Sequence, residues 1–277
     1  MLSYKHGYHA GNQADVLKHI CLIQTYKSLK KHHNSIIYID THAGSGTYKL
    51  NSEYMSKNKE YQNGISKLEN YQFENQAIKY YLKIIRNINN SKILHFYPGS
   101  PSIMSYLTDN SDRLSFYELH NNEFKLLRKN LSKQINSKVL NKDGFEFVNK
   151  KIKPNEKTLV LIDPSYEIKE DFDKVINTLE ILNNHYINLT AIIWYPVLNI
   201  ENNDLFIENI RKLGSNRITR IELPLKKYNE EIGMKGSGII LFNGNNFLIN
   251  NMKEYVRELY QIFKDENCNI KPKIQRI

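Results

Sequence analysis

Short runs of consecutive apolar residues recur along the chain, and most of them end in a turn rich in polar residues, glycine or proline. Such runs, without polar alternation, are typical of strands buried on both faces of a parallel sheet. Seven of them lie at residues 35–40, 113–118, 138–144, 158–163, 189–197, 218–223 and 238–243. Helical spacings occur between them, so we predict an α/β fold with a mostly parallel, seven-stranded, Rossmann-like sheet. The last two runs lie too close together for a helical crossover and predict an antiparallel pair at the sheet edge.

The first helix is predicted over residues 12–31, where apolar residues recur at helical spacing. Asn12 can cap this helix, and Asp15 falls in its first turn. The residues before it combine aromatic rings and histidines with two glycines. We interpret residues 1–18 as a lid that folds over a ligand, and the alternative is that these aromatic rings pack against the sheet edge.

Residues 48–95 are polar and rich in Tyr, Lys and Asn, with helical spacings but no clear strand. In doubly wound folds about 20 residues separate the glycine loop from the acid that binds a ribose. Glu118, the next acid at a strand end, lies much farther from the loop that contains Gly44. We therefore predict one domain over residues 1–277, with a small helical subdomain inserted at residues 48–95.

Residues suited to binding a nucleotide-like cofactor follow the predicted strands. Gly44 lies in a short loop where the backbone can approach a ligand closely, although the loop is shorter than the dinucleotide fingerprint. Glu118 can accept hydrogen bonds from a ribose diol, and Asp143-Gly144 suits an adenine amino group or a plain turn. Because the carboxyl ends of parallel strands lie at one edge of a sheet, we expect these residues to converge with Asp163.

The stretch Asp163-Pro164-Ser165-Tyr166 resembles the Asp/Asn-Pro-Pro-Tyr/Phe motif of amino-methyltransferases, which move a methyl group from S-adenosylmethionine to the exocyclic nitrogen of adenine or cytosine. That nitrogen is a poor nucleophile because its lone pair is delocalised into the ring. Asp163 and the Pro164 carbonyl can accept its two N–H groups, and Tyr166 can stack on a base extruded from its helix. Ser165 replaces the usual second proline, which loosens the turn. The alternative interpretation is an ordinary strand-to-helix turn.

Composition narrows the class of partner. Lys and Arg number 39 against 29 Asp and Glu, a formal charge of +10 that favours a nucleic-acid partner, although an AT-rich genome also enriches Lys and Asn. The two cysteines, Cys21 and Cys268, form neither a disulfide framework nor a zinc-ligand pair, which favours a reducing cytoplasm. Neither a signal-peptide core nor an apolar run of about 18 residues is present, so no membrane partner is expected.

Further segments carry a resemblance over nearly the whole chain to the bacterial 23S rRNA adenine-N6 methyltransferase J family, which is also named for catabolism of external DNA. The segments are Ser3-Tyr4-Lys5-His6, His9-Ala10-Gly11-Asn12, Ala14-Asp15-Val16-Leu17-Lys18-His19, Asp40-Thr41-His42-Ala43-Gly44, Tyr97-Pro98-Gly99-Ser100-Pro101, Glu118-Leu119-His120, Asp143-Gly144-Phe145 and Trp194-Tyr195-Pro196-Val197. The resemblance is weakest at residues 48–95 and over the last 30 or so residues.

The resemblance implies an S-adenosylmethionine methyltransferase fold and a catalytic acceptor, Asp163. It implies cofactor contacts from Lys18, His19, His42, Ser100, Glu118, Asp143, Gly144 and Asp163. The substrate implied is adenine 2030 of 23S rRNA, naked or in an early assembly intermediate, with S-adenosylhomocysteine as the product. The base is expected to contact Pro164, Tyr166 and, from the lid, Tyr4. The enzyme is expected to be a cytoplasmic monomer without a metal.

Two other functions are kept as alternatives. One is a DNA adenine methyltransferase or a factor for using external DNA. No DNA-reading domain is obvious, and a compact domain suits an RNA loop better. The other is a non-catalytic or metal-binding protein built on His6, His9, His19 and His42, although no spaced Cys/His set supports zinc.

Overall fold

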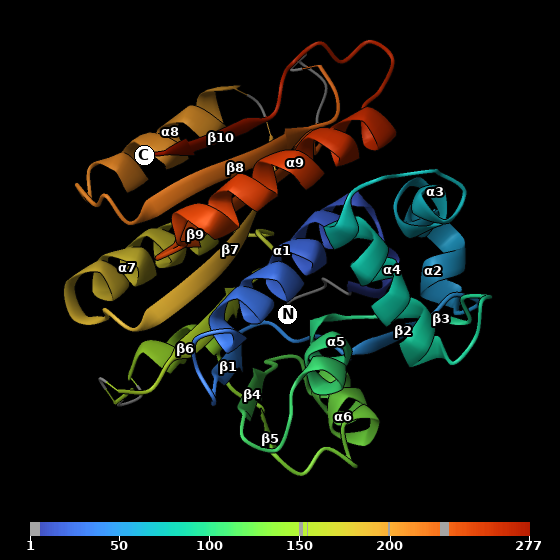
Figure 1. Cartoon of the computed structure of the whole chain (residues 1–277), viewed down its shortest axis with the longest axis horizontal. Coiled ribbons are helices and arrows are strands. Elements are labelled where there is room, and N and C mark those ends of the chain that lie inside the picture. Colours follow the sequence, from blue (N-terminus) through green and yellow to red (C-terminus); the bar gives the residue numbers. More distant parts are fainter. Residues whose placement is uncertain (1–5, 150–151, 154, 199, 228–232) are drawn as a thin grey trace.

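The computed structural model describes residues 6–149, 152–153, 155–198, 200–227 and 233–277. Its central feature is an eight-stranded sheet in the order β10-β8-β9-β7-β6-β1-β4-β5 (Figure 1). From one edge to the other the strands are β5 (Ser137–Leu140), β4 (Arg113–Tyr117), β1 (Ile37–Asp40), β6 (Thr158–Ile162), β7 (Leu189–Val197), β9 (Gly236–Phe242), β8 (Ile218–Pro224) and β10 (Lys273–Arg276). Strands β5 to β7 are parallel, and β9, β8 and β10 follow antiparallel. The predicted α/β class and mostly parallel sheet are confirmed.

The order of the strands reverses between β1 and β6. From β1 the chain adds β4 and β5 on one side, and from β6 it adds β7 on the other. In open α/β sheets ligands bind beyond the carboxyl ends of the strands at such a switch point. The fold therefore places a binding site next to the loops after β1 and β6.

The predicted count of seven strands is one short. β10 pairs with β8 at the edge of the sheet, so the antiparallel pair β8–β9 is correct but lies one strand inside that edge. The sequence of β10 contains one apolar residue, Ile274, and half of the strand is exposed. A short polar edge strand carries too little hydrophobic pattern to be recognised from the sequence.

Successive residues of the central strands face opposite sides of the sheet. In β6, Leu159 and Leu161 belong to one buried cluster, while Val160 and Ile162 belong to the other. The helices that contribute to the first cluster include α1 (Gln13–Lys30), α4 (Gln76–Asn89), α5 (Ser100–Leu107), α6 (Asn121–Asn130) and α9 (Asn246–Phe263). Helices of the second are α7 (Glu170–His185) and α8 (Ile200–Arg211). The sheet is thus covered on both faces, which explains its continuous apolar strands.

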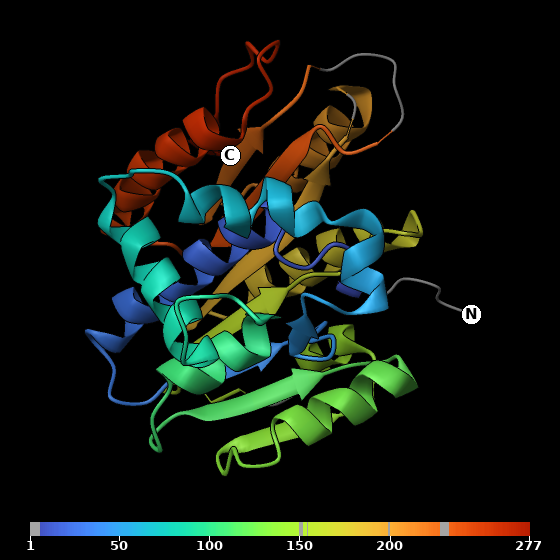
Figure 2. The same ribbon diagram turned by 90° about the vertical axis from the view of Figure 1, so that its right-hand side faces the viewer.

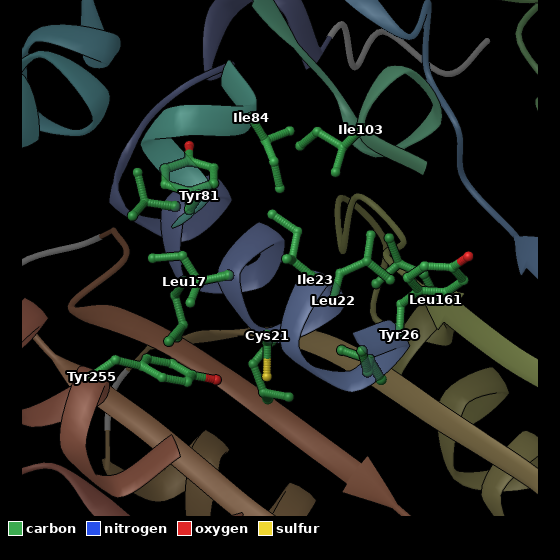
Figure 3. Close-up of a cluster of buried hydrophobic side chains, with 14 of the residues drawn as sticks. Leu17, Cys21, Leu22, Ile23, Tyr26, Tyr81, Ile84, Ile103, Leu161 and Tyr255 are labelled. Carbon is green, nitrogen blue, oxygen red and sulfur yellow. The ribbon is translucent and has the colours of Figure 1, made fainter. Parts of the chain in front are cut away.

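Helix α1 is buried on nearly every side. Asn12 caps it as predicted, accepting hydrogen bonds from the backbone N–H groups of Ala14 and Asp15 at 3.0 Å each. Figure 3 shows its side chains meeting Tyr81 of α4 and Tyr255 of α9. Fourteen of its 18 residues are buried, so its polar side chains must find partners inside the protein.

The segment 48–95 begins and ends in a small antiparallel sheet that was not predicted. β2 (Thr47–Lys49) pairs with β3 (Phe96–Pro98), although no strand is predicted at either position. Between them lie α2 (Glu53–Asn58), the 3-10 helix η2 (Glu60–Asn63), α3 (Ile65–Glu69) and α4. Figure 2 shows the cyan helices beside the blue α1 and the red α9, in agreement with the contacts of α4 with α1 and of α3 with α9. Strands of three residues are too short for a periodic signal.

Candidate active site

One cavity lies at the carboxyl ends of β1, β4, β5 and β6 and reaches α1. Its wall contains ten of the residues selected from the sequence. They are Lys18, His19, His42, Gly44, Ser100, Glu118, Asp143, Gly144, Asp163 and Pro164. These residues come from six separate segments of the chain, and only the fold brings them together.

The loop after β1 contains Gly44 and is fixed by a hydrogen bond to Glu118. Gly44 has φ +59°, and a Cβ there would lie 2.1 Å from the Tyr48 hydroxyl. Its N–H donates to one carboxylate oxygen of Glu118 at 2.8 Å, and the N–H of His120 donates to the other at 2.7 Å. Burial raises the pKa of Glu118, and these two backbone donors oppose that rise. Each oxygen keeps a second lone pair, so the carboxylate can still accept from a ligand.

The loop after β5 packs directly on the loop after β1. A Cβ at Gly144 would lie 1.8 Å from the backbone oxygen of Thr41, so only glycine fits. Asp143 accepts a hydrogen bond from the N–H of Phe145 at 2.9 Å, and the Phe145 ring lies edge-on to His42 at 5.1 Å. Burial lowers the pKa of His42 to about 4, so this ring is neutral at pH 7.

A buried polar row runs from α1 towards β3. His19 Nδ1 lies 2.7 Å from the Tyr97 hydroxyl, which lies 3.0 Å from that of Tyr81. Burial lowers the pKa of His19 to about 3, which keeps the imidazole neutral. Ser100 begins α5 and reaches the cavity, and Gly99 is the N-cap residue of this helix. The extended backbone of Gly99 makes it the last residue outside the helix.

The central charge contact of the cavity joins α1 to the loop after β6. Lys18 Nζ forms an ion pair with Asp163 Oδ2 and a second with Asp15 Oδ1 at 2.8 Å. Burial lowers the pKa of Lys18, but the charges of Asp15 and Asp163 outweigh it and raise the pKa above its usual value. Asp15 also binds His6, with 3.0 Å between His6 Nε2 and Asp15 Oδ2. Lys18 is therefore a permanent ammonium ion beside the predicted catalytic carboxylate.

Tyr166 is fixed by hydrogen bonds to Asp171 and Trp194. It is not part of the cavity wall. Its backbone is left-handed, with φ +54°, and its N–H donates to Asp171 at 3.2 Å. Its hydroxyl donates to the backbone oxygen of Trp194 at 2.6 Å, and its ring packs on Phe172 with 4.5 Å between centroids. Ser165 lies between it and Pro164, and both of those residues line the cavity.

Several cavity residues were not selected from the sequence as site residues. Asp15 lies behind the cavity wall, where it binds Lys18; the sequence places it only in a helix turn, although its spacing to Lys18 on one face of α1 signals a pair. Tyr48 carries no comparable signal, whereas Asp171 and Lys174 have the same spacing on α7, with 3.9 Å between Lys174 Nζ and Asp171 Oδ1. Tyr4 lies outside the described residues.

The histidines considered as metal ligands have separate partners. His6 binds Asp15, whereas His9 Nδ1 lies 2.8 Å from Glu60. Across the described ranges, no group of three or more His, Cys, Asp or Glu residues is arranged to hold a metal ion. Nor does any helix in these ranges have the length and apolar character needed to cross a membrane.

Comparison with known proteins shows which family the chain belongs to. A family model described as ribosomal RNA large subunit methyltransferase D, RlmJ, matches residues 33–271. The chain belongs to this family. It is 38% identical over 256 residues to the ribosomal RNA large subunit methyltransferase J of Haemophilus influenzae, covering 92% of this chain and 91% of that protein. It is 35% identical over 244 residues to the ribosomal RNA large subunit methyltransferase J of Escherichia coli, covering 88% of this chain and 87% of that protein.

The fold of the whole chain is shared as well. The crystal structure of a protein from Legionella pneumophila strain Philadelphia 1 has a TM-score of 0.87 and 30% identity, covering 97% of this chain and 98% of that one. The resemblance drawn from the sequence motifs is therefore confirmed at the level of the family. The residues matched by the family model include the cavity segments after β1, β4, β5 and β6, whereas Lys18 and His19 precede them.

Proposed function

We propose that the protein transfers a methyl group from S-adenosylmethionine to N6 of an adenine in 23S rRNA, at position 2030 by family resemblance. Its membership of a large-subunit rRNA methyltransferase family supports the reaction class and the RNA. The observation that carries the proposal is the single cavity that joins Glu118 and Asp143 to Asp163 and Pro164. The first pair suits a nucleoside, and the second suits an exocyclic amino group.

The residues of the cavity fit S-adenosylmethionine. Gly44 and Gly144 occupy positions where a side chain would clash with Tyr48 or with the backbone of Thr41, so glycine allows the loops that carry the proposed cofactor contacts to pack closely. Glu118 has lone pairs for the ribose diol, and Asp143 has an acceptor for the adenine amino group. Lys18, His19, His42, Ser100 and Asp163 complete the proposed contacts. When bound, the cofactor supplies an electrophilic methyl group on a sulfonium.

Asp163 is the proposed catalytic acceptor. Its ion pair with Lys18 engages Oδ2, so Oδ1 can accept one N–H of the target amino group. The Pro164 carbonyl accepts the other N–H, and together they direct the nitrogen lone pair towards the methyl group. Positioned acceptors of this kind contribute most when water is excluded. The neutral His19 and His42 add no positive charge that would repel the sulfonium.

Tyr166 is proposed to stack on the extruded base, and Tyr4 to contact it from the N-terminal lid. The hydroxyl bond of Tyr166 to Trp194 fixes the ring orientation, which lowers the entropy cost of stacking. We assign residues 48–95 to an inserted helical subdomain. The RNA is proposed to be naked 23S rRNA or an early assembly intermediate, and the enzyme to be a cytoplasmic monomer without a metal.

The test is methylation with labelled S-adenosylmethionine of 23S rRNA fragments and, separately, of duplex DNA, followed by nucleoside analysis. The expected product is N6-methyladenosine in RNA that is absent with Asp163→Ala. Efficient methylation of duplex DNA without activity on the RNA fragments would instead identify a DNA adenine methyltransferase. A labelled nucleoside other than N6-methyladenosine would contradict the assigned target atom.

A further inference from the structure

We infer that Asp15 is a positioning residue for methyl transfer, which acts on the catalytic Asp163 through Lys18. The inference rests on the proposed function, because Asp163 is its proposed acceptor. Asp15 does not reach the reacting atoms in this arrangement. Its role is to hold the Lys18 ammonium where it orients one oxygen of Asp163 and leaves the other for the substrate.

The carboxylate of Asp15 is fixed from several directions. Its side chain is 1% exposed and lies in the first turn of α1. Oδ2 accepts a hydrogen bond from the N–H of Gly11 at 2.9 Å and contacts His6 Nε2 at 3.0 Å, while Oδ1 lies 2.8 Å from Lys18 Nζ. The N-terminus of a helix also stabilises a negative charge. A side chain with so many fixed contacts can hold a neighbouring ammonium in one place.

Lys18 lies between two carboxylates that are far apart in the sequence. Its side chain is 4% exposed and forms ion pairs with both Asp15 and Asp163. A buried ammonium needs a partner for its charge, and here the charge is shared between two. With Asp15 present, the Lys18 ammonium lies against the first turn of its own helix and pairs with Oδ2 of Asp163.

Without the Asp15 charge, Asp163 would be the remaining anionic partner of this ammonium. The ammonium would then contact both oxygens of Asp163, and Oδ1 would no longer be free for the substrate amino group. The three charges sum to −1 with Asp15 and to zero without it. The site would therefore also lose a negative charge that favours the positive charge developing on N6 in the transition state.

The variant Asp15→Asn removes the charge and keeps the shape. An amide has one acceptor oxygen and one NH2 donor. If the NH2 replaces Oδ2 it faces the N–H of Gly11, and if it replaces Oδ1 it faces the Lys18 ammonium. Either orientation places donor against donor, so the contact that holds Lys18 is weakened or the turn before α1 is loosened.

Asp112 provides a matched control. Asp112 is fully buried, and its Oδ1 lies 2.8 Å from Nζ of Lys30, another lysine of α1. Asp112 also accepts hydrogen bonds from the Tyr26 hydroxyl and the N–H of Ile36. It does not line the cavity. Asp112→Asn therefore removes a buried carboxylate that pairs with another lysine of α1, one that is 22% exposed, outside the cavity wall. It shows what the structural loss of a buried carboxylate alone does to turnover.

The experiment compares wild type, Asp15→Asn and Asp112→Asn by turnover on a 23S rRNA fragment, cofactor affinity by calorimetry, melting temperature and crystal structure. Asp15→Asn should lower kcat about 10- to 100-fold, the loss expected from misplacing a catalytic group by about 1 Å. The KM for RNA and the Kd of S-adenosylmethionine should stay within about threefold. Asp112→Asn should lower the melting temperature as much or more while kcat stays near that of wild type.

The crystal structures test the inference independently of activity. In Asp15→Asn the Lys18 Nζ should move from residue 15 and contact both oxygens of Asp163. If it stays within about 3 Å of residue 15 and still engages one oxygen of Asp163, the inference is wrong, whatever the turnover. Wild-type kcat in an active Asp15→Asn enzyme would also overturn it. An inactive wild-type enzyme would instead count against the proposed RNA reaction.

Discussion

Replacing Glu118 with alanine should damage both the fold of the cavity and the binding of the cofactor. The sequence predicts only a loss of ribose contacts, but the structure shows that Glu118 also joins two loops. Its two oxygens accept the N–H groups of Gly44, after β1, and of His120, after β4. Alanine would leave both donors without this partner.

The magnitude follows from these contacts. Leaving a buried donor unpaired costs about 1–3 kcal/mol, and because Gly44 and His120 are only half-buried, water can partly replace the lost partner. We therefore use the lower figure of about 1 kcal/mol for each, or about 2 kcal/mol in total. For a chain of this size the melting temperature should fall by about 4–6 °C. Loss of the ribose bonds should weaken S-adenosylmethionine binding by about 1–3 kcal/mol, or about 5- to 150-fold.

Thermal melting of the cofactor-free protein and titration calorimetry measure the two effects separately. Glu123→Ala is the control, because Glu123 lines the same cavity from the first turn of α6 without joining the two loops. It should shift the melting temperature by no more than about 2 °C, as the loss of a charge at a helix terminus would. An unchanged melting temperature in Glu118→Ala would refute the joining role, and an unchanged cofactor affinity would refute the ribose role.

The remaining predictions concern the base, the N-terminal contacts and the RNA. Asp163→Ala should lower methyl transfer by about 10² or more in a folded protein, and near-normal turnover would exclude it as the acceptor. Tyr166→Ala should reduce turnover on RNA by about 1–3 kcal/mol of lost stacking while cofactor affinity holds. Tyr166→Phe should keep turnover but lose about 1 kcal/mol of stability with the bond to Trp194, and a stable, inactive Phe variant would contradict stacking as the main role. The hydrogen bond that His9 donates to Glu60 raises the pKa of His9. Burial raises the pKa of Glu60, but the hydrogen bonds that Glu60 accepts from His9 and Asn12 outweigh burial and lower this pKa. This pair should therefore stabilise the fold by about 0.5–1 kcal/mol between about pH 4.5 and 6.5, because both groups are about a third exposed. The gain should vanish as pH rises through the raised pKa of His9 or falls through the lowered pKa of Glu60, so Glu60→Gln should show no such maximum in melting temperature against pH. Binding to RNA should weaken as salt rises, given the formal charge of +10, and salt-independent binding in a filter assay would argue against phosphate contacts.

Much of the fold follows from short-range pattern. The apolar run before Asp163 predicts a strand buried on both faces, and β6 divides its residues between the two buried clusters as that pattern requires. Asn12 caps α1 because a side-chain acceptor satisfies N–H groups two and three residues away. The rule that parallel strands end at one edge then brings Gly44, Glu118 and Asp143 together. In each case the cause acts within one element or follows from strand direction alone.

Tertiary structure decided which side chains of the cavity touch. No local rule places Asp15 and Asp163 on one ammonium, since 148 positions separate them and the contact depends on how α1 packs beneath α4 and α9. The anchoring of Tyr166 by the backbone of β7 depends likewise on the neighbouring strand. β10 forms because β8 offers an unpaired edge, not because its own residues favour a strand. Hydrophobic periodicity records which face of an element is buried, whereas a hydrogen bond or ion pair depends on two surfaces that meet only when the whole chain has packed.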